Sequence, residues 1–342
     1  AWIEPSRTRD MGRTMLRMYR EGGQLPVWEL ASNYTGCMIG YHSVPVMVDA
    51  LAWDIHNWDQ NLALEAMVQA ADSMHLGLDA YTEFGYIPSD HEHESVSKTL
   101  EYAFDDACIA RMAAHLNQAD VEMRFRRRAA HWTNLYNPAS GFIQPKRKGA
   151  WNEGFEPREV NFNFTEANAW QYLFAAQHDI QGQAALAGGD SAYLAKIDAM
   201  FNAPVQTTGR VQPDITGLRG QYAHGNEPSH HVSYLASYAG APSQTADRVR
   251  DICKNLYNDS PAGLCGNEDC GQMSAWYVWS ALGMYPVEPG SGQLVLGSPL
   301  FEQMVVQPAQ GETTTLDAPQ ATTRPYIEQA TWTGLDGHVA NG

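Results

Sequence analysis

Carboxylates, amides and aromatic side chains are concentrated in three short segments of the chain. They are FNFTEANAWQY at residues 162–172, YAHGNEPSHH at 222–231 and GNEDCGQMSAW at 266–276. In each segment an acidic residue precedes a predicted helix, where free backbone N–H groups and the helix dipole favour negative charge. Helix capping is therefore one interpretation of each acid, and a functional site is the other.

The neighbours of these acids favour chemistry on a sugar. Glu166 is followed within five residues by an amide, an indole and a second amide, and the acids at 227 and 268–269 have similar company. Sugar hydroxyls need donors and acceptors, and glycosidic cleavage needs two carboxyls that flank the bond, one of them a general acid. Glu166 and Asp269 are 269 − 166 = 103 residues apart. Only a closed fold would bring them to opposite sides of one sugar.

The elements that must position these residues are mostly helical. The apolar residues recur with helical periodicity up to about residue 285, and long loops rich in Gly, Pro and polar residues connect the helices. A helical scaffold whose long loops gather at one end would place the chemistry in the loops. The expected helices lie near 7–20, 42–55, 60–75, 93–116, 118–132, 166–178, 191–201, 229–239, 243–256 and 271–283.

The texture of the sequence changes after Pro286. Strand-like alternation between turn residues replaces the helical pattern, at 293–296, 304–306, 313–316 and 326–332. We therefore expect a mainly α fold with a helical barrel over 1–286 and a short, partial β-rich domain over 287–342.

Composition excludes some partners. The chain has 342 residues, and 22 Lys and Arg against 39 Asp and Glu give a net charge of −17. Binding to nucleic acid or an anionic membrane needs clustered basic residues, which are scarce here. No apolar run is long enough for a membrane span. Five cysteines without a CxxC pair indicate neither a zinc ribbon nor a disulfide framework.

Several long motifs, in order, resemble glycoside hydrolase family 92, the calcium-dependent exo-acting α-mannosidases. They are LPVWEL (25–30), CMIGYHSVPV (37–46), ESVSKTLEYAFDDACIA (94–110), and the segments at 222–231 and 266–287. The resemblance implies an (α/α)6 barrel, inversion of the anomeric configuration, a mannose-containing glycan such as an N-glycan or mannan as substrate, and Ca²⁺ at the sugar. It also implies an extracellular or periplasmic location, and it leaves the oligomeric state open.

The resemblance also implies roles for individual residues. Glu166 aligns with the general acid, whose pKa burial should raise, and Asp269 aligns with the general base, with Glu268 as the alternative. Glu227 is the alternative acid. If the mechanism inverts, the carboxyls of Glu166 and Asp269 should lie roughly 6.5–9.5 Å apart. The expected calcium ligands, all hard oxygen donors, are Asn226, Glu227 and Gln272.

Further residues are expected to contact the sugar, although core packing or a structural role remains an alternative for Trp28 and the histidines. This set is Trp28, Glu29, His42, Trp170, Gln171, His224, His230 and His231. Gly225 departs from the His-Glu pair of α-1,2-specific members, which favours another linkage or aglycone.

The ends also depart from the family pattern. The amino-terminal β-sandwich and a Trp-Asp-Thr segment of the family are not in the sequence, and about ten helices are expected instead of twelve. We therefore expect a barrel that is incomplete at its amino-terminal end and a fragment that is inactive alone. Two other functions stay open: a non-catalytic glycan-binding or inactive fragment, and another (α/α)6 glycosidase or phosphorylase that does not use calcium.

Overall fold

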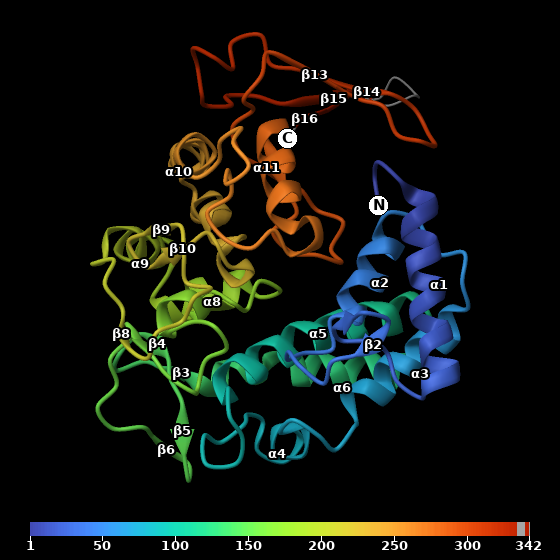
Figure 1. Ribbon diagram of the computed structural model, residues 1–342, viewed down its shortest axis with the longest axis vertical. Helices are drawn as coiled ribbons and strands as arrows, with labels where there is room; N and C mark the ends of the chain where they lie inside the picture. Colours follow the sequence, from blue (N-terminus) through green and yellow to red (C-terminus); the bar gives the residue numbers. More distant parts are fainter. Residues whose placement is uncertain (334–338, 342) are drawn as a thin grey trace.

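The computed structural model describes residues 1–333 and 339–341, and its main elements are helices arranged in a ring (Figure 1). The α-helices are α1 (Pro5–Gly22), α2 (Ser43–Ala52), α3 (Gln60–Ala71), α4 (Leu78–Phe84), α5 (Ser95–His115), α6 (Ala119–Ala129), α7 (Ala169–Tyr172), α8 (Ile180–Ala187), α9 (Asp190–Asn202), α10 (Pro242–Asn255) and α11 (Gln272–Leu282). The 3-10 helices are η1 (Ala130–Leu135), η2 (Glu227–Ser229), η3 (Val232–Ala239) and η4 (Asp269–Gly271).

Each predicted helical segment has a counterpart, but two differ from the expected form. The segment 166–178 contains only the single turn α7, and 229–239 forms 3-10 helix instead of α-helix. The helices α4 and α8 were not expected. Left-handed glycines at 77 and 85 delimit α4, and the Asp179 carboxylate accepts a bond from the Gly182 N–H (2.9 Å) to start α8. Short capped helices of this kind carry too little periodicity to be predicted.

Helix α5 is the central element of the amino-terminal half. It is buried on most of its faces and packs against α2, α3, α6 and η1. Its residues belong to two hydrophobic clusters: Val96 and Leu100 lie in one, and Tyr102 and Ile109 in the other. A helix buried all round is an inner element, which makes α5 a rigid support for the loops at its ends.

A buried ion pair joins α5 to its neighbours. The Asp106 carboxylate accepts bonds from Arg128 Nε (2.9 Å), the Tyr41 hydroxyl (2.5 Å) and the Tyr81 hydroxyl (3.0 Å). Burial raises the pKa of Asp106 to about 6, although Arg128 and the hydroxyls oppose the rise. Each partner comes from a different part of the chain, so the pair fixes how α4, α6 and the start of α2 sit on α5.

Three tryptophans join the two ends of the helical ring. The Trp2 ring stacks on Trp279 of α11 at 5.5 Å and on Trp53, just after α2, at 6.3 Å between centroids. Stacked aromatic pairs add attraction beyond the apolar area they bury. These contacts hold the amino-terminal residues against the last helix.

Among the described residues, the strands are short and pair in twos. All pairs are antiparallel except β7–β8, and β11–β12 spans the expected domain boundary at residue 286. The strands are β1 (Glu29–Leu30), β2 (Asn33–Tyr34), β3 (Tyr136–Asn137), β4 (Phe142–Ile143), β5 (Lys146–Arg147), β6 (Ala150–Trp151), β7 (Glu159–Val160), β8 (Thr208–Gly209), β9 (Leu218–Arg219), β10 (Tyr222–Ala223), β11 (Met284–Tyr285), β12 (Val295–Leu296), β13 (Gln303–Val306), β14 (Thr314–Asp317), β15 (Thr331–Thr333) and β16 (Val339–Asn341).

The carboxyl-terminal strands lie over the end of the helical ring (Figure 1). Arg250 of α10 donates from Nη2 to the carbonyls of Pro299 and Ala321, both at 2.6 Å, which ties this segment to the helices. The strand expected at 326–332 is confined to β15. The division into domains at 286 and 287 stays a prediction.

Two further observations concern the whole chain. The five cysteines, Cys37, Cys108, Cys253, Cys265 and Cys270, are all unpaired. Among the described residues, no helix combines the length and the apolar character needed to cross a membrane.

Candidate active site

The three acidic segments meet at the starts of inner helices. The Asn226 amide Nδ2 lies 3.2 Å from Glu166 Oε2 and 3.4 Å from the Glu166 carbonyl oxygen, which joins the first two segments. Gln272 at the start of α11 lies with its Nε2 3.0 Å from His230 Nδ1, which joins the second to the third. Residues far apart in the sequence are therefore neighbours, as the prediction of a closed fold requires.

Glu166 lies on strained backbone, and the pKa of its carboxyl is raised. Its backbone φ is +51°, a left-handed conformation that a non-glycine residue adopts at a cost of about 1–3 kcal/mol. Burial raises its pKa, the Asn226 amide lowers it, and the carboxylates of Asp214, Asp269 and Glu94 raise it further. The net direction is upward, as expected for a general acid.

Glu227 and Asp269 form a second carboxyl pair beside Glu166. Burial raises the pKa of Glu227, and the neighbouring carboxyl of Asp269 raises it further. Asp269 and Cys270 both have left-handed backbone, with φ of +51° and +57°. Within the described part of the chain, no Lys or Arg forms a salt bridge with Glu166, Glu227 or Asp269. We call these three residues the acid cluster.

Glu268 has a different role from Asp269 although the two are adjacent. Its carboxylate accepts bonds from the Gly271 N–H (2.5 Å) and from both the N–H (3.2 Å) and hydroxyl (2.7 Å) of Ser274. The Ser274 hydroxyl lowers the pKa of Glu268, which is half-buried. Glu268 therefore caps the start of α11, and this arrangement favours Asp269 over Glu268 as the base.

The acid loop is fixed by a capping box at α7. The Asn168 side chain accepts from the Trp170 N–H (3.0 Å), and the Gln171 side chain accepts from the Asn168 N–H (2.7 Å). The Gln171 Nε2 donates to the Gln221 carbonyl (2.5 Å), so both ends of this predicted sugar ligand are engaged within the protein. Gln171 therefore holds the acid loop in place, and its amide is already bonded within the protein.

The Trp170 ring packs away from the acid cluster. It makes an edge contact with Phe142, with centroids 4.7 Å apart, and the Lys196 ammonium lies 5.8 Å from its centroid. The ring is therefore part of the packing between α7, β4 and α9. A sugar contact by Trp170 stays a prediction without support from these contacts.

Three of the four predicted histidines, those at 224, 230 and 231, are buried and bonded within the protein. Both nitrogens of His224 face tyrosine hydroxyls, those of Tyr222 at 2.8 Å and Tyr257 at 2.7 Å. His230 Nε2 donates to the His224 carbonyl (2.9 Å), and His231 Nε2 to the carbonyl of Phe174 (2.8 Å). Burial lowers the pKa of His224 to about 2 and those of the other two to about 4, so all three are neutral at pH 7.

His42 lies in a carboxylate clamp on α5. Its Nε2 is 2.8 Å from Glu101 Oε2, its Nδ1 is 2.9 Å from Asp105 Oδ1, and 41% of its side chain is exposed. Burial opposes the charge, but the two carboxylates outweigh it and raise the pKa of His42. The other oxygen of Glu101 accepts from the Tyr172 hydroxyl at 2.6 Å. Glu101 thus connects His42 to α7.

The polar stripe of α5 was missed by sequence reasoning. Ser97, Glu101 and Asp105 recur every fourth residue on one helix face. The Ser97 hydroxyl accepts from the Thr165 N–H at 2.9 Å, next to Glu166. This spacing of polar residues in an otherwise apolar helix was the available signal. Asp214, which also raises the pKa of Glu166, had no comparable signal in its loop.

Trp28 and Glu29 lie in the loop before α2. Trp28 is 44% exposed, and its carbonyl accepts from Thr35, while Glu29 starts β1. No hydrogen bond within the described residues joins either one to the acid cluster. Their sugar contacts stay predictions.

Two amide side chains beside the acid cluster carry oxygen atoms of the kind that bind a hard cation. Asn226 and Gln272 use their NH2 groups on Glu166 and His230, which leaves both amide oxygens for other partners. In the described parts of the chain, no group of three or more His, Cys, Asp or Glu is arranged to hold a metal. A calcium ion here would therefore need the amide oxygens, which calcium accepts as ligands. The residues present fit this donor set.

Comparison with known proteins shows the family to which the chain is similar. The model of the glycosyl hydrolase family 92 catalytic domain matches residues 1–338. A curated protein of Arthroderma benhamiae, named an uncharacterized secreted glycosidase, is 25% identical over 94% of the chain.

Solved structures match as well. A family GH92 alpha-mannosidase from Bacteroides thetaiotaomicron, in complex with mannoimidazole, superposes with a TM-score of 0.89 and 34% identity over 96% of the chain. A family GH92 inverting mannosidase from B. thetaiotaomicron VPI-5482 superposes with a TM-score of 0.85 and is 36% identical over 95% of the chain. The predicted (α/α)6 barrel class is confirmed. The chain covers only 45% of the first of these proteins and 46% of the second, and 45% of the curated relative.

Proposed function

Because the chain belongs to glycosyl hydrolase family 92, we propose that it forms the catalytic barrel of a calcium-dependent, inverting exo-α-mannosidase. The single observation that carries this proposal is the acid cluster. Glu166 and Asp269 both sit on strained, left-handed backbone beside Glu227, with no basic partner in the described chain. Strained backbone and carboxyls without a cationic partner cluster at functional sites, which supports a catalytic role for Glu166 and Asp269.

The proposed reaction is a single displacement. A water oxygen attacks the anomeric carbon of a terminal α-linked mannose while the bond from that carbon to the leaving oxygen breaks. Asp269 takes a proton from the water, and Glu166 gives its proton to the leaving oxygen. The first product is β-mannose. The bond from Asn226 to Glu166 keeps the acid directed at the leaving group.

Calcium is proposed to be held by Asn226, Glu227 and Gln272. When bound, the ion supplies a positive charge that fixes and polarises the sugar hydroxyls. These assignments rest on the donor chemistry of the residues.

The leaving group is proposed to be joined by a linkage other than α-1,2. A Cβ added to Gly225 would lie 1.8 Å from the Thr216 hydroxyl oxygen and 3.2 Å from the Cys265 carbonyl oxygen. No side chain fits at 225 unless Thr216 moves. The acidic residue of the His-Glu pair in α-1,2-specific members therefore has no place here, and the space at this position is closed.

The substrate is proposed to be a mannose-containing glycan outside the cytoplasm, such as an N-glycan or mannan. The fungal relative is named a secreted glycosidase, which supports an extracellular or periplasmic location. The acidic charge of the chain also suits a neutral glycan better than a polyanion.

The test is release of mannose from α-linked mannobioses of each linkage. It uses the longest native form of the protein and the 342-residue chain, with calcium and after chelation, with NMR detection of the first anomer. We expect calcium-dependent release of β-mannose, slowest from the α-1,2 disaccharide. α-Mannose as the first product would overturn inversion, and release that resists chelation would overturn the calcium assignment. No release from folded protein of either form would favour a glycan-binding or inactive protein.

A further inference from the structure

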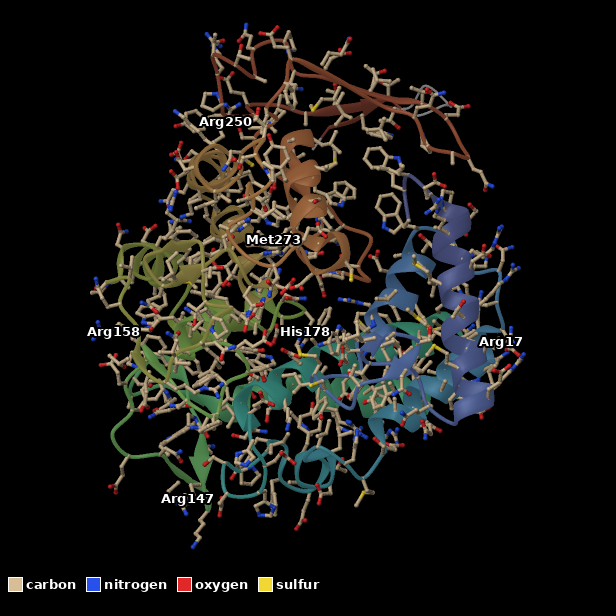
Figure 2. All side chains as sticks on the ribbon, viewed as in Figure 1. Arg17, Arg147, Arg158, His178, Arg250 and Met273 are labelled. Carbon is tan, nitrogen blue, oxygen red and sulfur yellow. The ribbon has the colours of Figure 1, made fainter. Side chains whose placement is uncertain are left out.

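An exposed aromatic ring lies just before the proposed general acid in the chain. Phe162 is 63% exposed and precedes Glu166 by 166 − 162 = 4 residues. Four residues of extended chain span at most about 14 Å, so the backbone of Phe162 lies within that distance of Glu166. Figure 2 labels Arg158 at one side of the molecule and Met273, at the start of α11, near its middle. The segment that contains Phe162 therefore leads from that side of the molecule to the acid cluster.

Backbone hydrogen bonds hold this segment against the start of α5. The Glu94 N–H donates to the Phe162 carbonyl (2.6 Å), and the Val96 N–H donates to the Asn163 carbonyl (3.1 Å). The N–H groups at the start of a helix have no partner within the helix, so these two bonds use donors that would otherwise be free. Because α5 is a buried inner helix, Phe162 is exposed on a backbone that is fixed in place.

One face of the Phe162 ring is covered, and the other is open. The guanidinium carbon of Arg210 lies over one face, 4.5 Å from the ring centroid. The His93 ring is 6.0 Å away between centroids and is inclined by 57°. The Arg210 N–H donates to the Val160 carbonyl of β7 (3.0 Å), which fixes the position of Arg210. A ring that is covered on one face and still 63% exposed leaves its other face to the solvent.

Carboxylates lie beside this ring and close to the proposed acid. Glu94, which bonds to Phe162 through its backbone, is left-handed with a φ of +58°, as Glu166 and Asp269 are with φ of +51°. Strained backbone of this kind is concentrated at functional sites. Glu94 and Asp214 both raise the pKa of Glu166, so their charges are near it. The surface beside Glu166 thus offers an apolar ring face and hydrogen-bond acceptors, the two kinds of group that a sugar contacts.

The proposed reaction places the leaving group on this side of the site. The acid and the base act from opposite sides of the bond that breaks, and the acid protonates the leaving oxygen. The leaving group therefore lies next to Glu166 and not next to Asp269. A single exposed phenylalanine needs no function in general. Phe162 differs because its backbone is fixed, its free face is open and its segment leads to the acid.

We propose that Phe162 determines specificity for the leaving group by stacking its open face on a sugar there, with Glu94 as an acceptor for the hydroxyls of that sugar. The face of an aromatic ring is negative and attracts the C–H groups on one side of a sugar. The preferred substrate is then an oligosaccharide in which at least one sugar follows the terminal mannose. This inference rests on the proposed mannosidase function and adds the group that the site holds beyond the bond that breaks.

The first test compares leaving groups with and without a sugar. Phe162→Ala removes the ring, and Phe162→Trp keeps an aromatic face. Phe301→Ala is the matched control, because Phe301 is also exposed (53%) but lies in the carboxyl-terminal segment before β13. The substrates are an α-linked mannotriose and α-mannosyl fluoride, whose leaving group contains no sugar, and the enzyme is the longest native form of the protein.

The two substrates should respond differently. In Phe162→Ala, kcat/KM on the trisaccharide should fall by about tenfold, mainly through KM, and on the fluoride it should change by about twofold or less. Phe162→Trp and Phe301→Ala should stay within about threefold of the wild type on both substrates. An equal loss on both substrates in Phe162→Ala, or no loss on the trisaccharide, would overturn the inference.

The second test measures binding without turnover, so that the inference and the proposed function can fail separately. Glu166→Gln is the background, and saturation-transfer NMR follows the mannotriose and methyl α-mannoside. Phe162→Ala should weaken binding of the trisaccharide by about tenfold and change that of the methyl mannoside by about twofold or less. If the wild type releases no mannose from the trisaccharide, the mannosidase proposal fails and this binding result still decides the role of Phe162. Trisaccharide binding that is equal with and without the Phe162 ring, or absent in the background variant, would overturn the inference.

Discussion

Two groups of carboxyls in this protein differ in their partners: Asp106 is buried, whereas in the acid cluster Glu166 and Glu227 are half-buried and Asp269 is exposed. Around Asp106, one guanidinium and two tyrosine hydroxyls satisfy the carboxylate on both oxygens. In the acid cluster, the Glu166 carboxylate accepts one hydrogen bond from the Asn226 amide, and the Asp269 carboxyl raises the pKa of Glu227. Burial raises the pKa of Asp106, Glu166 and Glu227 alike, but only Asp106 has a cationic partner that opposes the rise.

The difference separates stability from function. A paired carboxylate with every oxygen bonded holds elements together, and the loss of its partner costs folding energy. Carboxyls that lack a cation and sit on strained backbone destabilise the fold unless something else binds there. The site therefore pays in stability for groups that a substrate and a cation would satisfy.

The largest difference in activity is expected between variants of the adjacent acids Asp269 and Glu268. Asp269→Asn removes the proposed base and should lower kcat on α-mannosides by about 10²–10⁴-fold. Glu268→Gln keeps an acceptor for the cap of α11 and should change kcat by about twofold or less. Steady-state kinetics on the longest native form, with melting temperatures as the folding control, decide between them. Equal losses in both variants would show that the cap, not the base, explains the effect.

Removal of the Arg128 guanidinium, the charge partner of Asp106, should lower the stability of the fold. Arg128→Met leaves Asp106 buried without its charge partner and should lower the free energy of unfolding by about 3–5 kcal/mol in urea titrations. Adding Asp106→Leu to this variant should recover most of the loss, because neither charge then remains buried. A loss below about 1 kcal/mol in Arg128→Met would contradict a stabilising role for the pair.

Acid pH should lower the stability of the fold through its buried histidines. Burial lowers the pKa of His131 and of His178 to about 4, below the value of roughly 6.5 in an unfolded chain. Below pH 6.5 the unfolded chain binds protons that the folded one does not, so stability is lost as pH falls towards 4. We expect about 1–2 kcal/mol per histidine near pH 5 in urea titrations. His131→Gln should reduce this slope, and an unchanged slope would contradict the assignment.

His42 should show the reverse pH dependence. Its pKa is raised by Asp105 and Glu101, so its contribution to stability is present below about pH 6.5 and is lost as pH rises through the folded value. This follows from the same linkage between proton binding and folding.

A smaller effect on kcat is expected from the loss of Glu101, which connects His42 to Tyr172 of α7. Glu101→Gln removes the charge opposite His42 and weakens the bond to Tyr172, so α7 and the acid loop are held less firmly. We expect kcat to fall by about three- to tenfold with KM little changed. Tyr172→Phe removes only one of the contacts and should have a smaller effect. A pH–rate profile that is unchanged in Glu101→Gln would indicate that Glu101 has no positioning role.

Much of the fold was predictable because it follows from helical periodicity. The long helices α1, α5 and α10 lie where the sequence pattern predicts them. The pattern failed at α7, because a capping box, which periodicity does not report, starts the helix only at Ala169, and a single turn follows. Strands of two residues also leave no readable alternation.

The sequence indicated the acids of the candidate site but not the residues that support them, and the catalytic roles of these acids stay predictions. Glu166 and Asp269 could be singled out because their motifs are long and specific. The histidines and Gln171 could not be separated into ligands and supports, because a buried histidine that bonds two tyrosines has the same sequence signature as one that faces a sugar. That distinction depends on which atoms are already bonded, as the contacts of His224 show.

The most direct test of the account is the dependence of Glu166→Gln on the leaving group. Activity of the longest native form is measured on an α-mannobiose and on an aryl mannoside whose phenol leaves without a proton. If Glu166 is the general acid, the variant should lose about 10²–10⁴-fold on the disaccharide and tenfold or less on the aryl mannoside. Equal losses on both substrates, in protein that melts like the wild type, would contradict the assignment of Glu166 and with it the role given to the acid cluster.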